Sequence, residues 1–131
     1  MGGWGTGSFE NDDAADWLAD LAVVGPADLA KIFTQAADDP AYLEAPAASV
    51  AVAAAEVVAA LNGSPSPAAP PAIAAWVNKY PKVTTPELNS LAIRALERVR
   101  TNSELKDLWM EADGLNDWTA VIRDLQARLG G

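Results

Sequence analysis

The sequence contains no cysteine and no histidine, and these two absences exclude whole classes of chemistry. Without cysteine there is no disulfide bond, no thiolate zinc site and no cysteine nucleophile. Without histidine the chain lacks the commonest general base and the commonest transition-metal ligand, so a Ser-His-Asp triad is excluded. Any enzyme built from this chain would have to act through carboxylates, Lys, Tyr or Ser. We therefore expect a protein that is not an enzyme, and we predict no catalytic residue, metal site or cofactor.

The sequence also lacks a long, purely apolar run. The stretch 45–61 is apolar, but it consists mostly of Ala and includes Glu56, which is not typical of a membrane span. No basic region precedes an apolar stretch at the N-terminus, as it would in a signal peptide. These features predict a soluble, cytoplasmic protein.

Basic residues are scarce in the first half of the chain. Residues 1–65 hold ten acidic residues and one basic residue, Lys31, whereas residues 66–131 hold eight of each, so the whole net charge of −9 lies in the first half. Nucleic acid and anionic membrane are therefore poor ligands for that half, whereas a basic partner protein or a cation is compatible with it. Acidity that only keeps the protein soluble explains the same distribution.

Apolar residues recur with helical spacing in nearly every segment, and no strand pattern is present. The length of 131 residues is typical of one domain. We predict an all-α fold, a compact single-domain array of six or seven short helices over residues 1–131. An N-terminal segment, 1–10, is expected to pack on this array, and a Pro/Ser-rich surface loop is expected at 62–71.

Capping residues and helix breakers predict where the helices begin and end. Asn11 is expected to cap the first helix, and Gly25-Pro26 separates it from a second helix that ends at Asp39-Pro40. The other predicted boundaries are a third helix at 47–61, a fourth that Pro81 breaks, a fifth capped by Thr85, a sixth opened by Asn102 or Ser103, and a seventh capped by Asn116.

The opening stretch, MGGWGTGSFENDDAADW, allows four interpretations. A phosphate-binding loop would follow a strand and carry Gly-Lys-Ser/Thr, and neither is present. Gly2 and Thr6 fit the loose myristoylation pattern, but no basic cluster supports membrane anchoring. We prefer a structural role, in which the glycines let Trp4 and Phe9 fold back onto the first helix.

The fourth interpretation of the opening stretch is a cation site. Asp12, Asp16 and Asp20 are spaced i, i+4, i+8, and Asp13 lies one turn before Asp16. Carboxylates on one helix face can hold Ca²⁺ or Mg²⁺, although the spacing of a calcium-binding loop is absent. We prefer a solvated acidic face opposite the apolar stripe of the first helix.

Glu56 is the single charged residue of the Ala-rich helix, and Ser49 shares its face because the two are seven positions apart. A buried charge needs a partner. Arg94 and Arg98, one turn apart on the fifth helix, are the candidate partners for an ion pair, and a Glu at the helix rim that touches water is the other structural interpretation. A functional interpretation is a carboxylate in an apolar cleft that acts as acid, base or cation ligand.

The opening residues follow the pattern Met-Gly-x-Trp-Gly-x-Gly-x-Phe-x-Asn-Asp-x-Ala-x-Asp, carried by Met1, Gly2, Trp4, Gly5, Gly7, Phe9, Asn11, Asp12, Ala14 and Asp16. This pattern resembles the N-terminal signature of a bacterial family known as domain of unknown function 4259. The resemblance continues through YLEAPAAS, AAAEVVAALNG and SELKDLWMEADGLNDW. It implies a small, soluble bacterial protein that forms one whole domain, with no assigned activity and no catalytic residue to carry over.

Two hypotheses about function follow from the sequence. The first is a non-enzymatic protein-interaction or regulatory module that uses an acidic or aromatic surface. The second is a small-ligand or divalent-cation-binding protein, with enzymatic activity as an option, that uses Glu56 and the carboxylates of the first helix. A convex acidic face would favour the first, and a concave apolar pocket enclosing Glu56 would favour the second.

Overall fold

The computed structural model describes residues 5–80 and 86–130, and these residues form α-helices, one short 3₁₀ helix and no strand. The predicted all-α array is confirmed. The elements are α1 (Asp12–Ala19), a 3₁₀ turn (Leu21–Val23), α2 (Pro26–Asp38), α3 (Ala45–Leu61), α4 (Pro71–Lys79), α5 (Pro86–Thr101), α6 (Glu104–Glu111) and α7 (Leu115–Arg128). None of these helices is long and apolar enough to cross a membrane.

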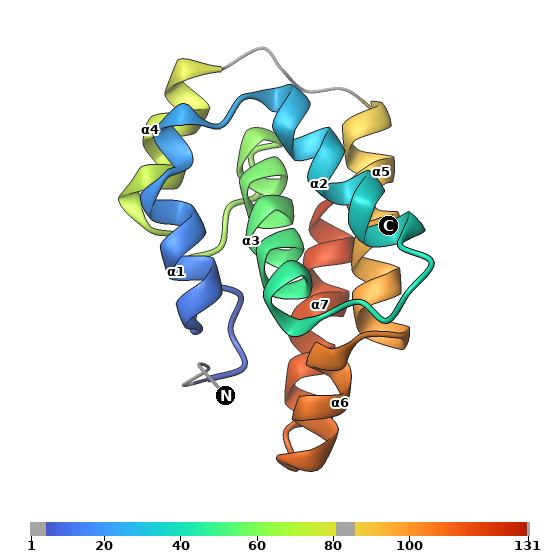
Figure 1. Cartoon of the computed structure of the whole chain (residues 1–131). Coiled ribbons are helices and arrows are strands. Elements are labelled where there is room, and N and C mark those ends of the chain that lie inside the picture. Colours follow the sequence, from blue (N-terminus) through green and yellow to red (C-terminus); the bar gives the residue numbers. More distant parts are fainter. Residues whose placement is uncertain (1–4, 81–85, 131) are drawn as a thin grey trace.

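The Ala-rich helix α3 is the centre of the fold (Figure 1). It contacts each of the other α-helices, and every residue from Ala51 to Ala59 is buried. Short side chains explain this position, because helices approach one another more closely where alanine lies between them. A helix that is apolar nearly all round is stable only when it is surrounded.

The other helices surround α3 in groups (Figure 1). On one side α1 packs with the 3₁₀ turn and α4, and on the other side α2 packs against α5. At the N-terminal end of α3, α6 lies against α7, and both reach the central helix. Within the described residues α1 and α2 do not contact each other, so a strip of α3 lies between them. One hydrophobic core, with Phe33, Leu96 and Ile122 among its fully buried members, joins all of these helices.

Two predicted caps are confirmed by their hydrogen bonds. The Asn11 side chain accepts from the backbone N–H of Ala14 at 2.8 Å, which caps α1. Ser103, one of the two residues expected to open the sixth helix, accepts from the N–H of Lys106 at 3.1 Å. Each satisfies a donor that the first turn of a helix leaves without a partner. The predicted cap of the fifth helix, Thr85, lies outside the described residues.

Two boundaries differ from the sequence prediction. Helix α7 begins at Leu115 with Gly114 as its N-cap, so the prediction of Asn116 as the cap is wrong. The chain turns earlier because Asp113 adopts a positive φ of 59°. Helix α3 begins at Ala45 instead of residue 47, because proline fits the first turn of a helix and Pro46 therefore lies inside α3.

The N-terminal segment packs on the helices as predicted, as far as it is described. Ser8 is buried, and Phe9 is half-buried against the core. Trp4, which was expected to be buried beside Phe9, lies outside the described residues. In the predicted surface loop, none of residues 62–71 is buried.

Candidate functional site

Glu56 is buried in α3, and its carboxylate is bound on both oxygens. The residue is 3% exposed. Arg128 of α7 donates from Nη1 to Oε1 at 2.9 Å and from Nη2 to Oε2 at 3.1 Å. The hydroxyl of Ser8 donates to Oε2 at 2.6 Å. This bidentate pairing is the strongest arrangement of an arginine and a carboxylate, and its hydrogen bonds raise the pKa of Arg128 above its usual value.

A basic partner from another helix was predicted for Glu56, and this part of the prediction is confirmed. The predicted identity of that partner is wrong. Arg94 forms an ion pair with Asp38 at 2.5 Å. Arg98 donates to the backbone carbonyls of Asp39 and Ala41, at 2.7 Å each.

The geometry of α5 explains this error. Helix α5 packs on α3 through its apolar stripe, and Arg94 and Arg98 lie on the flank that faces the end of α2. Arg128 was missed because nothing local marks it. It is the last residue of α7 and comes immediately before the buried Leu129, and only the packing of α7 on α3 brings it to Glu56.

The acidic residues of α1 lie at the surface. Asp12, Asp16 and Asp20 are exposed, and Asp13 is half-exposed. None of the four forms an ion pair with a described residue. Among the described residues, no group of three or more acidic side chains is placed to hold a metal ion. Within the described part of the chain, these acidic residues therefore carry surface charge that no ion pair neutralises.

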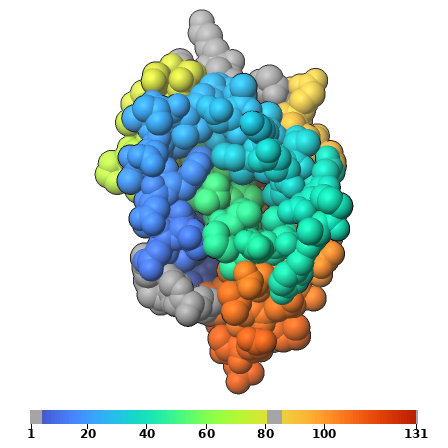
Figure 2. All heavy atoms as spheres, in the orientation of Figure 1, coloured from blue at the N-terminus to red at the C-terminus, as the bar shows by residue number. Residues whose placement is uncertain are grey.

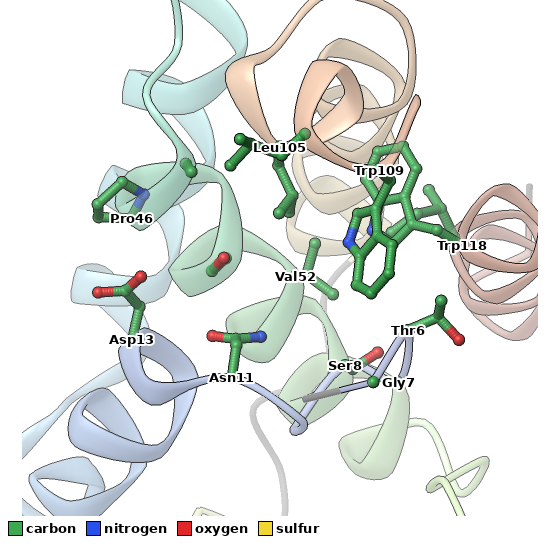
Figure 3. Close-up of a pocket in the computed structure, with 15 residues that line it drawn as sticks. Thr6, Gly7, Ser8, Asn11, Asp13, Pro46, Val52, Leu105, Trp109 and Trp118 are labelled. Carbon is green, nitrogen blue, oxygen red and sulfur yellow. The ribbon is translucent and has the colours of Figure 1, made fainter. Parts of the chain in front are cut away.

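A pocket of about 230 Å³ opens between the N-terminal segment, α1, α3, α6 and α7, and we call it the tryptophan pocket (Figure 3). Trp109 and Trp118 form one end, and Asp13 and Pro46 lie at the other end (Figure 3). The fifteen residues that line it are Gly5, Thr6, Gly7, Ser8, Asn11, Asp13, Ala45, Pro46, Ser49, Val52, Leu105, Leu108, Trp109, Trp118 and Ile122.

The two tryptophans are held in place by different means. Trp118 is 3% exposed and belongs to the core stripe of α7. Trp109 is half-buried, and its ring lies against the backbone of Gly114, where an added Cβ would come within 2.5 Å of Cε3. A side chain at position 114 would therefore push the Trp109 ring out of its place.

Polar groups point into the tryptophan pocket from several elements. Ser49 is 3% exposed, and its hydroxyl has no hydrogen-bond partner among the described residues. The nitrogen-bearing edges of Trp109 and Trp118 lie on the side of the rings that faces Val52 and the interior (Figure 3). The periodic pattern of apolar residues contains no sign that a pocket would form between the two tryptophans.

Ser49 and Glu56 share one face of α3, as their spacing predicted, and Ser8 connects their surroundings. Ser8 lines the tryptophan pocket beside Ser49, and its hydroxyl donates to Glu56. The hydrogen bond from Ser8 to Glu56 thus holds the N-terminal segment, which forms one side of the pocket, against α3.

A second hollow, the α2–α3 groove, has a volume of about 810 Å³ and lies on the other side of Pro46. Its lining is mainly apolar, and Asp38 and Asp39 stand at its edge. Figure 2 shows the corresponding face of the molecule, with α3 recessed between α1 and α2.

Comparisons with known proteins identify one family. A family model described as "Domain of unknown function (DUF4259)" matches residues 2–121. The match includes the opening stretch from Gly2 onward and ends before Arg128. The curated proteins and the solved structures gave no match.

Proposed function

The chain belongs to the DUF4259 family, and because that family's description names no activity, we propose a function from the chain's own surface. The protein is a protein-interaction module that binds a basic segment of another protein. The observation that carries this proposal is an exposed apolar strip of α3 that lies between α2 and α1, whose acidic residues form no ion pair with a described residue.

The apolar strip lies at the N-terminal half of α3. Pro46 and Ala47 are exposed and Val50 is half-exposed, although the rest of the helix is mostly buried. All three line the α2–α3 groove together with Ile32 and Leu43. Exposed apolar residues that form a continuous surface mark interaction sites more often than single exposed ones do.

The charges at the borders of the strip favour a basic partner. Asp13, Asp16 and Asp20 follow one another at helical spacing along α1, and α1 contains no basic residue. On the α2 side, Asp39 stands at the edge of the groove beside Asp38, whose charge is paired with Arg94. Acidic borders attract a basic segment over several ångströms and orient it, and the apolar floor then provides contact area.

The cation-binding alternative receives less support. The Glu56 carboxylate accepts hydrogen bonds from Arg128 and Ser8 on both of its oxygens, so it is engaged inside the fold. A divalent cation needs several oxygen ligands that converge. The acidic side chains of the described residues form no such group.

The test uses two labelled synthetic peptides that form amphipathic helices, one of Lys and Leu and one of Glu and Leu, with binding measured by fluorescence anisotropy. We expect the Lys peptide to bind and the Glu peptide not to bind. Replacing Asp16 and Asp20 by Asn should weaken binding about thirtyfold at low salt, since each charge pair contributes about 1 kcal/mol in water and the two together about 2 kcal/mol. The effect should shrink as salt is added.

A matched control removes the same number of charges elsewhere. Glu111 and Asp117 are also exposed, and they lie in the second half of the chain. Replacing them by Gln and Asn should leave binding nearly unchanged, whereas Val50→Asp should abolish it by placing a charge in the apolar floor. Equal losses in the two charge variants, or binding that survives Val50→Asp, would refute the proposal.

A further inference from the structure

We propose that the tryptophan pocket is a binding site for a small, neutral molecule with a flat apolar body and a hydrogen-bond acceptor, such as an aromatic amide. This site is separate from the α2–α3 groove, and the inference does not depend on the proposed protein partner. It is carried by the polar groups inside the pocket, by the charges around it and by its shape.

The polar groups that line the pocket are free to donate hydrogen bonds to a ligand. Ser49 is 3% exposed, and its hydroxyl has no partner in the part of the chain that the structure describes. The indole N–H groups of Trp109 and Trp118 likewise have no acceptor among the described residues. Trp76, by contrast, donates its indole N–H to the carbonyl of Val24 at 2.7 Å. An indole N–H can only donate, so a ligand with an oxygen or nitrogen acceptor would match the two donors at this end of the pocket.

The charges around the pocket favour a neutral ligand. No Lys or Arg is among the described residues that line it, so a bound carboxylate or phosphate would be buried without a counter-charge. Asp13, at the end opposite the tryptophans, adds repulsion for an anion (Figure 3). Asp13 and the indole faces would attract an ammonium group, but such a group has no acceptor for the indole N–H groups, so the acceptor has to come from a neutral polar group of the ligand.

The walls of the pocket favour a flat, apolar body. Val52, Leu105 and Ile122 line it beside the two indoles. A volume of about 230 Å³ holds a single ring with a short substituent and is too small for most drug-sized molecules. Aromatic rings prefer offset or edge-to-face contact with one another, and indole walls offer both arrangements.

The experiment is an NMR titration of ¹⁵N-labelled protein with four probes of one size: benzamide, benzoate, benzylamine and toluene. The indole N–H signals are assigned by single Trp→Phe variants. We expect benzamide to shift the signals of Trp109 and Trp118 in a saturable way and to leave the signal of Trp76 in place. Benzoate and benzylamine should bind at least tenfold more weakly, and toluene should bind without moving the indole N–H signals downfield.

Two variants at one position test the site itself. Ser49→Ala removes the hydroxyl with little change in volume, and benzamide should bind about threefold to tenfold more weakly, which corresponds to one hydrogen bond. Ser49→Leu fills the pocket and should abolish binding, while an unchanged set of Trp76 and Trp17 signals shows that the fold is retained. Ser64→Ala, outside the pocket, is the matched control and should bind as the wild type does.

Three results would overturn the inference. The first is that benzamide moves neither Trp109 nor Trp118 up to its solubility limit. The second is that benzoate or benzylamine binds as tightly as benzamide. The third is that Ser49→Leu, folded by its NMR spectrum, binds benzamide as the wild type does.

Discussion

The ion pair between α3 and α7 predicts an asymmetry in stability between its two ends. Removing Arg128 leaves the carboxylate of Glu56 in a place that is 3% exposed, with only the Ser8 hydroxyl as a donor. Stranding a buried charge in this way costs about 3–5 kcal/mol. Removing the charge of Glu56 is less severe, because the Arg128 side chain is 20% exposed and keeps its contacts with Asp124 at 2.9 Å and with the Ser64 carbonyl at 3.1 Å.

We therefore expect Arg128→Met to destabilise the protein by about 3–5 kcal/mol and Glu56→Gln by about 1.5–3 kcal/mol, the range for hydrogen bonds to a charged group. Both variants keep the size and approximate shape of the side chain. The double variant with Leu at position 56 and Met at position 128 should recover most of the loss, since two apolar groups replace the pair. Urea unfolding followed by far-UV circular dichroism measures each free energy, and similar slopes confirm that the unfolding reaction is the same.

The asymmetry would be refuted if Glu56→Gln cost as much as Arg128→Met, because solvent and Asp124 would then fail to stabilise the charge of Arg128 in the absence of Glu56. It would also be refuted if the double variant were no more stable than Arg128→Met alone. In that case the loss would come from the packing of the arginine stem and not from a stranded charge.

Three further predictions concern single contacts. Asn11→Ala should cost about 0.5–2 kcal/mol in urea unfolding, since it removes the cap of α1, and an unchanged midpoint would contradict the role of the cap. Gly114→Ala should destabilise the fold by about 1–3 kcal/mol and shift the Trp109 indole signal in NMR, because the added Cβ would meet the ring at 2.5 Å. The φ of −107° is one that alanine adopts without strain, so the loss would come from this contact alone, and a gain in stability would show that the ring moves freely. The hydrogen bond from Tyr42 to Asp107 raises the pKa of the tyrosine to about 12, so ultraviolet titration of the phenol in Tyr80→Phe protein should show a pKa that falls toward 10 in Asp107→Asn. Because the folded-state pKa is raised, this contact stabilises the fold below about pH 10, and its contribution is lost as the pH rises toward 12.

The helices were predictable because their signals are local. The periodic apolar residues, the cap at Asn11 and the Gly25-Pro26 junction each depend on neighbours within a few positions, and all three appear in the structure. The start of α7 was not predictable in the same way. Asn116 has the better capping side chain, but the turn at Asp113 places Gly114 at the N-cap instead.

The candidate site was less predictable because its parts come from distant segments. Spacing placed Ser49 and Glu56 on one face of α3, but it could not show which helix that face meets. Arg128 reaches Glu56 only after α7 has packed on α3, and the tryptophan pocket exists only where α6 and α7 meet the N-terminal segment. Ser8 and Arg128 lie 48 and 72 positions from Glu56 in the sequence, and contacts over such separations cannot be recognised from local composition.

The bridge from Ser8 through Glu56 to Arg128 also has a consequence for the order of events during synthesis. The N-terminal segment and α3 leave the ribosome long before α7, and domains on a growing chain begin to fold from the N-terminal side. Until Arg128 emerges, burial of α3 would enclose a carboxylate without its cation, at a cost of about 3–5 kcal/mol. We therefore expect the central helix to reach its native packing only after α7 has been synthesised.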